Sequence, residues 1–150
     1  MSRQPCHSRS RGSSGRASLE FLVTGIVLFV PLIWGAIVLL EIQKASMATD
    51  AAARHAVRVF TQSTSLDSAT RRVQLAVAST LGDFGVSASH QVDVECQPRS
   101  GCLLPESWAV VSVSTDVPLV GIPALPLSIP FAVPVDGTAA AQVSTYRGVP

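Results

Sequence analysis

Charged residues are scarce in this chain of 150 residues: they make up 14%, whereas hydrophobic residues make up 47%. Such a composition excludes an intrinsically disordered protein and indicates a membrane segment. Basic residues are not in large excess either, because the net charge is +1. Three arginines lie in the first fifteen residues, which contain no acid, so the rest of the chain lacks the positive charge of a nucleic-acid-binding surface. No nucleic-acid partner is expected.

Motifs of catalysis are also missing. The sequence has no Gly-rich phosphate loop and no Gly-x-Ser-x-Gly nucleophile motif. His90, Cys96 and Cys102 are three potential zinc ligands, but their spacing is that of no common zinc site. Asp93 and Glu95 would share one face of a strand, which is more typical of a solvated sheet face than of paired catalytic carboxylates. We therefore expect a protein that is not an enzyme, with no metal and no cofactor.

One uncharged run of twenty residues extends from Phe21 to Leu40, between Glu20 and Glu41. As a helix it would span ~30 Å, the thickness of the hydrocarbon core of a bilayer. A buried helix of a soluble protein would show a polar stripe, and this run has only Thr24. A secretory signal peptide is the nearest alternative, but its apolar core has about 7–15 residues. The run predicts a transmembrane helix, in which Pro31 should produce a bend.

Positive charge is concentrated before this run, in four arginines, and only Lys44 follows closely. By the positive-inside rule, the N-terminus is cytoplasmic and residues 41–150 are extracytoplasmic, with a single pass through the plasma membrane. The exported side is oxidising, so a bridge between Cys96 and Cys102 is more probable than two free thiols. Cys6, on the cytoplasmic side, should stay reduced.

The exported part is expected to be an α+β head. Apolar residues recur every three or four positions beyond Leu40, which predicts one long helix over residues 17–61 with a stripe of small residues for close packing. A second, shorter helix should begin at a cap on Ser65 or Asp67 and end near Leu81, with Gly82 as the stop signal. Alternation then predicts a small sheet of three antiparallel strands. Their centres are Val92 to Cys96, Val111 to Val117, and a stretch within 137–147 around Val143, Thr145 and Tyr146.

Five prolines interrupt an uncharged stretch at residues 117–135. Each interior proline costs a helix about 3 kcal/mol, so a second transmembrane span is excluded and an extended arm is expected. The arm either covers the core of the head or offers an apolar surface to another subunit or to the bilayer interface.

Residues 15–21 read Gly-Arg-Ala-Ser-Leu-Glu-Phe and stand directly before the apolar run, after an arginine-rich segment. This arrangement resembles the cleavage and assembly signal of type IV pilin-like precursors. Pro31 and Gly35 inside the run, the stretch Ala52 to Arg58, and the Tyr146-Arg147 ending make the chain similar to the TadE-like pseudopilins of the tight-adherence (Flp) pilus system. It departs from related major pilins in having Phe21 where they carry Tyr, and in having a basic residue at the proposed new N-terminus.

The resemblance implies a leader at 1–15, a transmembrane helix at 16–40, and cleavage by a prepilin peptidase between Gly15 and Arg16. It also implies that Glu20 and Phe21 take part in assembly with other pilin-like subunits. The expected function is that of a non-catalytic pilus assembly subunit that packs through its N-terminal helix into a surface filament or export machine. The alternative is an unprocessed, single-pass membrane-anchored domain that binds an envelope partner, with Glu20 as a flanking charge.

Overall fold

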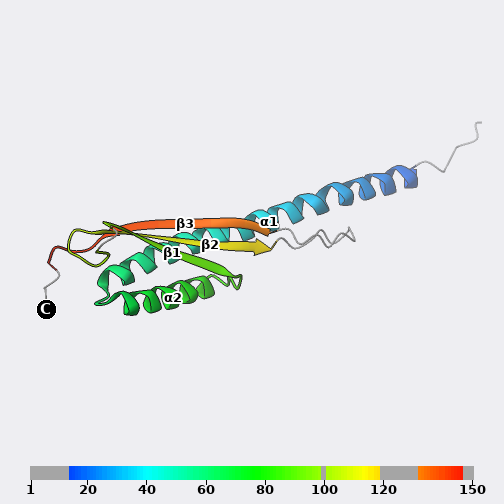
Figure 1. The fold of residues 1–150 in the computed structure, drawn as a ribbon. Coiled ribbons are helices and arrows are strands. Elements are labelled where there is room, and N and C mark those ends of the chain that lie inside the picture. The colour runs from blue at the N-terminus through cyan, green and yellow to red at the C-terminus, as the bar shows by residue number, and fades with distance from the viewer. Residues whose placement is uncertain (1–13, 99–100, 119–131, 147–150) are drawn as a thin grey trace, which may run out of the picture. The chain divides into compact units, whose positions relative to one another are not determined.

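The computed structural model describes residues 14–98, 101–118 and 132–146 of the chain. Their elements follow in the order α1, α2, β1, β2, β3, two helices and then three strands (Figure 1). The described residues fall into two compact units, one up to Ile37 and the other, called the head below, from Val38 onward. The expected α+β fold, with a long N-terminal helix, a shorter second helix and a three-stranded antiparallel sheet, is confirmed.

The first helix, α1, extends from Ser14 to Gln62 and belongs to both units. It starts three residues before the predicted start and ends one residue after the predicted end. Within the head, its buried positions recur every three or four residues and are mostly small: Ala45, Ala48, Thr49, Ala52, Ala53, Ala56, Val57 and Phe60. The predicted stripe of small residues therefore lies in the core of the head, where it lets other elements approach the helix axis closely.

The second helix, α2, extends from Leu66 to Asp83. Ser65 is its N-cap, and it forms a capping box with Ser68, so two backbone N–H groups of the first turn find acceptors. The predicted stop at Gly82 is wrong, because Gly82 lies inside the last turn. The helix ends at Asp83, and the chain turns away at Gly85, whose φ of 67° is the left-handed conformation that glycine adopts without a steric penalty. The N–H of Val86 then donates to the Leu81 carbonyl, which completes the cap.

The sheet consists of β1 (His90–Gln97), β2 (Trp108–Pro118) and β3 (Ala132–Gln142). The strands are antiparallel in the order β1-β2-β3, so β2 is central. One face of the sheet is turned toward the helices and carries the alternating apolar residues, with Val111 and Val113 fully buried at its centre. These valines form one cluster with the buried face of α2 and with the alanines of α1. The core of the head thus lies between the inner face of the sheet and the two helices.

The position of the third strand corrects the prediction. It was expected within 137–147, but it begins at Ala132, and Val143, Thr145 and Tyr146 all follow its end. As an edge strand, β3 tolerates Pro134, because one side of its backbone pairs with no strand in the described part of the chain.

The predicted arm at 117–135 begins and ends in paired strand. Val117 lies opposite Val133 and Pro118 lies opposite Ala132, so both ends of the arm belong to the sheet. Val117 and Val135 pack against Ala45 of α1 in a second, smaller cluster. The two ends of the arm therefore cover the core of the head, and residues 119–131 between them lie outside the described residues.

Candidate assembly surface

The apolar part of α1 before residue 38 forms a helix surface without a polar face. Its side chains are exposed all around the helix, including Phe21, Leu28 and Phe29, each of which is more than 60% exposed. By length and composition, this helix is the one candidate membrane span among the described residues. Such a surface is stable only in contact with lipid or with other apolar helices.

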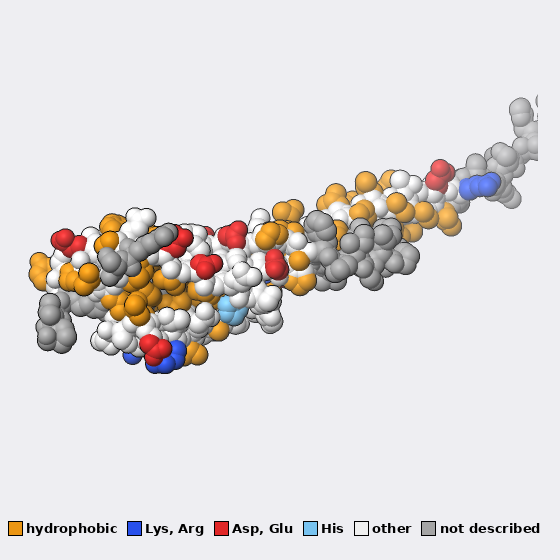
Figure 2. All heavy atoms as spheres, in the orientation of Figure 1, with side chains coloured by type: hydrophobic (Ala, Val, Ile, Leu, Met, Phe, Trp, Pro, Cys, Tyr) orange, Lys and Arg blue, Asp and Glu red, His pale blue; other side chains and the backbone are white. Residues whose placement is uncertain are grey.

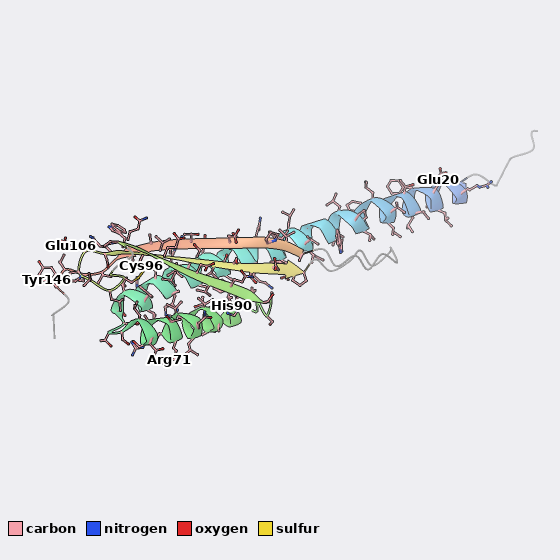
Figure 3. All side chains as sticks on the ribbon, in the orientation of Figure 1. Glu20, Arg71, His90, Cys96, Glu106 and Tyr146 are labelled. Atoms are coloured by element: carbon pink, nitrogen blue, oxygen red, sulfur yellow. A yellow bond between two sulfur atoms is a disulfide. The ribbon has the colours of Figure 1, made fainter. Side chains whose placement is uncertain are left out.

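Glu20 and Phe21 stand at the start of this surface, in the second turn of α1 (Figure 3). Both side chains are exposed, and Arg16 lies one helical turn before Glu20. No ion pair joins Arg16 to Glu20 in the described part of the chain, although residues four apart are neighbours on a helix. Among the described residues, the Glu20 carboxylate has no ion-pair partner.

The proposed cleavage junction lies at the first turn of α1. The helix begins at Ser14, so Gly15 and Arg16 are helical, whereas leader residues 1–13, with Cys6, lie outside the described residues. The first-turn N–H groups of a helix have no partner within the helix, and helix ends fray. A peptidase could thus extend the backbone at this bond at small cost.

Pro31 lies inside α1 and does not end it. Because proline has no N–H, the Val27 carbonyl one turn earlier lacks its helical donor. Gly25 and Gly35 flank this site, and a Cβ added at either would meet no atom within 4 Å. This part of α1 therefore presents both a free carbonyl and positions where a second helix could approach closely.

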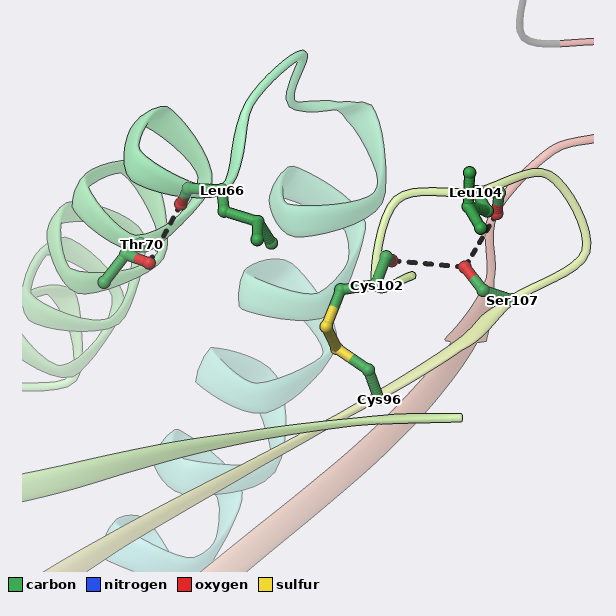
Figure 4. Close-up of a disulfide and its surroundings, with 6 residues drawn as sticks. All are labelled: Leu66, Thr70, Cys96, Cys102, Leu104 and Ser107. Atoms are coloured by element: carbon green, nitrogen blue, oxygen red, sulfur yellow. Dashed lines mark hydrogen bonds between the residues drawn. A yellow bond between two sulfur atoms is a disulfide. The ribbon is translucent and has the colours of Figure 1, made fainter. Parts of the chain in front are cut away.

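Cys96 and Cys102 are joined by a disulfide at the far end of β1, with their Cα atoms 5.1 Å apart (Figure 4). Ser107 holds the end of this loop: its hydroxyl donates to the carbonyls of Cys102 and Leu104, at 3.2 and 2.7 Å. Its own carbonyl accepts from the N–H of Val143 at 2.8 Å, just past the end of β3. The bridge thus ties the loop to β1, and Ser107, just before β2, ties it to the end of β3. The sequence did not predict that Ser107 would hold this loop, because its burial and its hydrogen bonds are seen only in the structure.

The other polar residues considered from the sequence do not come together. Asp93 and Glu95 are exposed on the outer face of β1, as a solvated sheet face requires. His55, which the sequence analysis does not single out, lies on α1, where its Nδ1 is 3.2 Å from the Thr80 hydroxyl of α2. His90 begins β1, far along that strand from the disulfide at its other end. Since both cysteines are oxidised, the three potential zinc ligands form no site.

Sequence reasoning also missed Gly137, which the structure places against the backbone of α1. A Cβ at this position would lie 2.4 Å from the carbonyl carbon of Thr49. A glycine inside a strand is a signal of such close approach, but the predicted strand was centred on Val143, Thr145 and Tyr146, with Gly137 only at its edge.

Comparison of the chain with family models, curated proteins and solved structures gives no match.

Proposed function

We propose that this protein is a pseudopilin-type assembly subunit, resembling the TadE-like proteins: a single-pass membrane protein with a cytoplasmic N-terminus and an extracytoplasmic head. A prepilin peptidase removes residues 1–15, and the mature helix packs beside those of other pilin-like subunits in a surface filament or export machine. The subunit acts by packing and not by catalysis.

The observation that carries the proposal is the construction of α1. One continuous helix exposes an uncharged apolar surface over residues 21–40 and then supplies the central buried stripe of the head. A simple anchor needs only a span, and a flexible linker to the head would serve it equally well. In α1, one helix carries both the apolar surface and the stripe on which the head packs, and this supports a subunit whose N-terminal helix takes part in assembly.

A second support is the single carboxylate at the start of this apolar surface. Glu20 lies next to the uncharged run and has no ion-pair partner among the described residues. A charge is costly inside the membrane unless it is paired, so an unpaired carboxylate here suits a contact with a neighbouring helix. In the competing view, that of an unprocessed anchored domain, Glu20 only faces the lipid headgroups.

The mature N-terminus distinguishes the two functions. We expect the intact mass of the protein purified from its native membrane to correspond to a chain that begins at Arg16. N-terminal sequencing should give Arg-Ala-Ser-Leu-Glu. A chain that begins at Met1 or Ser2, from cells with an active prepilin peptidase, would refute processing and leave the anchored-domain function.

A further inference from the structure

Among the described residues, no helix covers the outer face of the sheet, and the charged side chains on it are all acidic. They are four exposed carboxylates spread over the three strands: Asp93, Glu95, Asp116 and Asp136. Their neighbours across the strands are uncharged, for example Ser112 beside Asp93 and Ser114 beside Asp136. None of the four has an ion pair or hydrogen bond in the described part of the head. This acidic sheet face therefore has its hydrogen-bonding capacity free for a partner.

An exposed aromatic side chain extends the same face. Trp108 is 49% exposed and lies between Gln97 and Gln142 in the sheet register. Glu95 is in the next row, opposite Val110. An indole ring next to a carboxylate is suited to a guanidinium group, which stacks on the ring and donates two hydrogen bonds to the carboxylate. The acidic sheet face thus has the chemistry that recognises arginine.

Arginines are present on the opposite side of the same head. Four of them are exposed on the helices, two toward the end of α1 and two in the first half of α2: Arg54, Arg58, Arg71 and Arg72. Only Arg71 is paired, with Asp67, and that exposed pair is worth little. Asp50 precedes Arg54 by one turn, but no ion pair joins the two in the described residues. In Figure 2, red side chains lie over the sheet, and the blue side chains of the head lie at α2 with red beside them.

We propose that the acidic sheet face of one subunit binds the arginines of the helices, here called the arginine patch, on a second copy of this chain. The charges are complementary, and each surface faces away from the other on its own head, so one copy cannot satisfy itself. A contact between two different surfaces of identical subunits is heterologous, and it repeats from copy to copy as a filament requires. This inference rests on the proposed assembly function and names the partner and the surfaces of the head.

Crosslinking of purified full-length protein in detergent micelles tests this contact. Two single-cysteine variants are made in a Cys6→Ser background that retains the disulfide. One is Ser112→Cys in the acidic sheet face, and the other is Leu75→Cys, one turn from Arg71 on α2. We expect a short bis-maleimide to join the two variants when they are mixed, and to join neither variant efficiently to itself. Efficient crosslinking of Ser112→Cys alone, or no crosslink in the mixture, would overturn the proposal.

Charge reversal shows whether the arginines and carboxylates cause the contact. Asp93→Arg with Glu95→Arg should lower the mixed crosslink about tenfold, because like charges then face each other. Arg54→Glu with Arg58→Glu on the other copy should restore it. The control is Asp83→Arg, which makes one such charge reversal at the end of α2, outside both surfaces, and should leave the yield unchanged. An equal yield in the Asp93→Arg, Glu95→Arg protein would refute the proposal.

The same measurement in a Glu20→Gln protein separates this contact from the membrane-helix packing under the proposed function. The contact uses no residue of the span, so the head crosslink in micelles should persist at its normal yield. Loss of the head crosslink in this variant would refute a contact made by the heads themselves. Failure of processing or of helix packing, with the head crosslink retained, would count against the proposed function and not against this contact.

Discussion

Gly137 of β3 lies directly on the backbone of α1 at Thr49. A Cβ at Gly137 would stand 2.4 Å from the Thr49 carbonyl carbon and 2.6 Å from the Asp50 nitrogen, closer than nonbonded atoms can approach. Backbone therefore meets backbone here, and no side-chain rotation could make room. The alanines of α1 on either side, Ala45 and Ala52, are small enough to allow this approach. Gly137 and the small-residue stripe together set the spacing between β3 and the helix.

Gly137→Ala should destabilise the head. The added methyl group must push β3 away from α1 or distort the sheet, and overpacking of this kind costs about 1–3 kcal/mol. We expect a lower midpoint in thermal unfolding of the full-length protein in detergent, followed by circular dichroism.

Gly82→Ala is the matched control, because it makes the same chemical change with the opposite expected sign. A Cβ at Gly82 meets no atom within 4 Å, and the residue lies in the last turn of α2. Alanine there should raise stability by about 0.5–1 kcal/mol through its higher helix propensity. If Gly137→Ala unfolded at or above the wild-type temperature, the close contact between β3 and α1 would be wrong.

The positions of the two helices and of two strands could be predicted from the sequence, because their signals are local. Apolar spacing of three to four located α1 and α2, and strict alternation located β1 and β2. The third strand carries Pro134, Gly137 and three successive alanines from Ala139, all residues that are poor strand formers. These residues suit β3 because it is an edge strand and because it lies close to α1. Neither property can be predicted before the fold is known. Tyr146 has a high strand propensity, so the strand was predicted too close to the C-terminus.

The candidate sites divide in the same way. The Gly15 junction, Glu20 and the Cys96–Cys102 pair are each defined by a few neighbouring residues, so a linear pattern was enough to propose them. The acidic sheet face is made of residues from three strands. It could be recognised only from the strand register, which pairs Asp93 with Ser112 and Asp136 with Ser114. Arg54 and Arg58, by contrast, fall opposite the apolar stripe of α1, a position that the spacing of three to four residues already indicates.

The disulfide should be present in the purified protein and should stabilise the loop after β1. Non-reducing mass spectrometry is expected to find Cys96 joined to Cys102 and Cys6 absent from the mature chain. Closing a loop with a sequence separation of 6 gains about 2 kcal/mol, so Cys96→Ala with Cys102→Ala should lower the unfolding midpoint. Cys6→Ser is the control and should leave it unchanged. Two thiols that alkylate without a reductant would contradict the bridge and also the exported position of the head.

Processing should depend on the small residue that ends the leader. Gly15→Leu is expected to leave the precursor uncleaved, because a branched side chain does not fit the small pocket that a prepilin peptidase presents to this position. Gly12→Leu makes the same change three residues earlier and should be cleaved normally. The masses of both proteins, isolated from cells with the active peptidase, provide the readout. Removal of residues 1–15 from the Gly15→Leu protein would eliminate the proposed junction.

Glu20 provides the most direct test of assembly through the membrane helix. A carboxylate inside the apolar part of a bilayer costs ~2.5–3.5 kcal/mol at the centre and less near the edge, unless a partner is present. Cleavage after Gly15 would create a positively charged α-amine on Arg16, one helical turn from Glu20. When helices stack side by side with an axial offset, the amine of one subunit can reach the carboxylate of the next. Paired burial is tolerated where burial of one charge is not, so this pair would set the register of the helices.

Glu20→Gln should therefore be inserted and cleaved normally yet fail to co-assemble. The measurement is crosslinking to neighbouring subunits in the membrane from Gly25→Cys or Gly35→Cys, two positions with open space around them. We expect the yield to fall at least about tenfold, which corresponds to a loss of 1.4 kcal/mol in association. Glu41→Gln is the matched control, since it removes a carboxylate from the other end of the uncharged run, where Lys44 pairs with it at 2.6 Å. That variant should crosslink like the wild type, because its carboxylate has a partner within its own helix. Wild-type yields in the Glu20→Gln protein would mean that the carboxylate only faces the lipid headgroups, and the anchored-domain function would then be the better account of this chain.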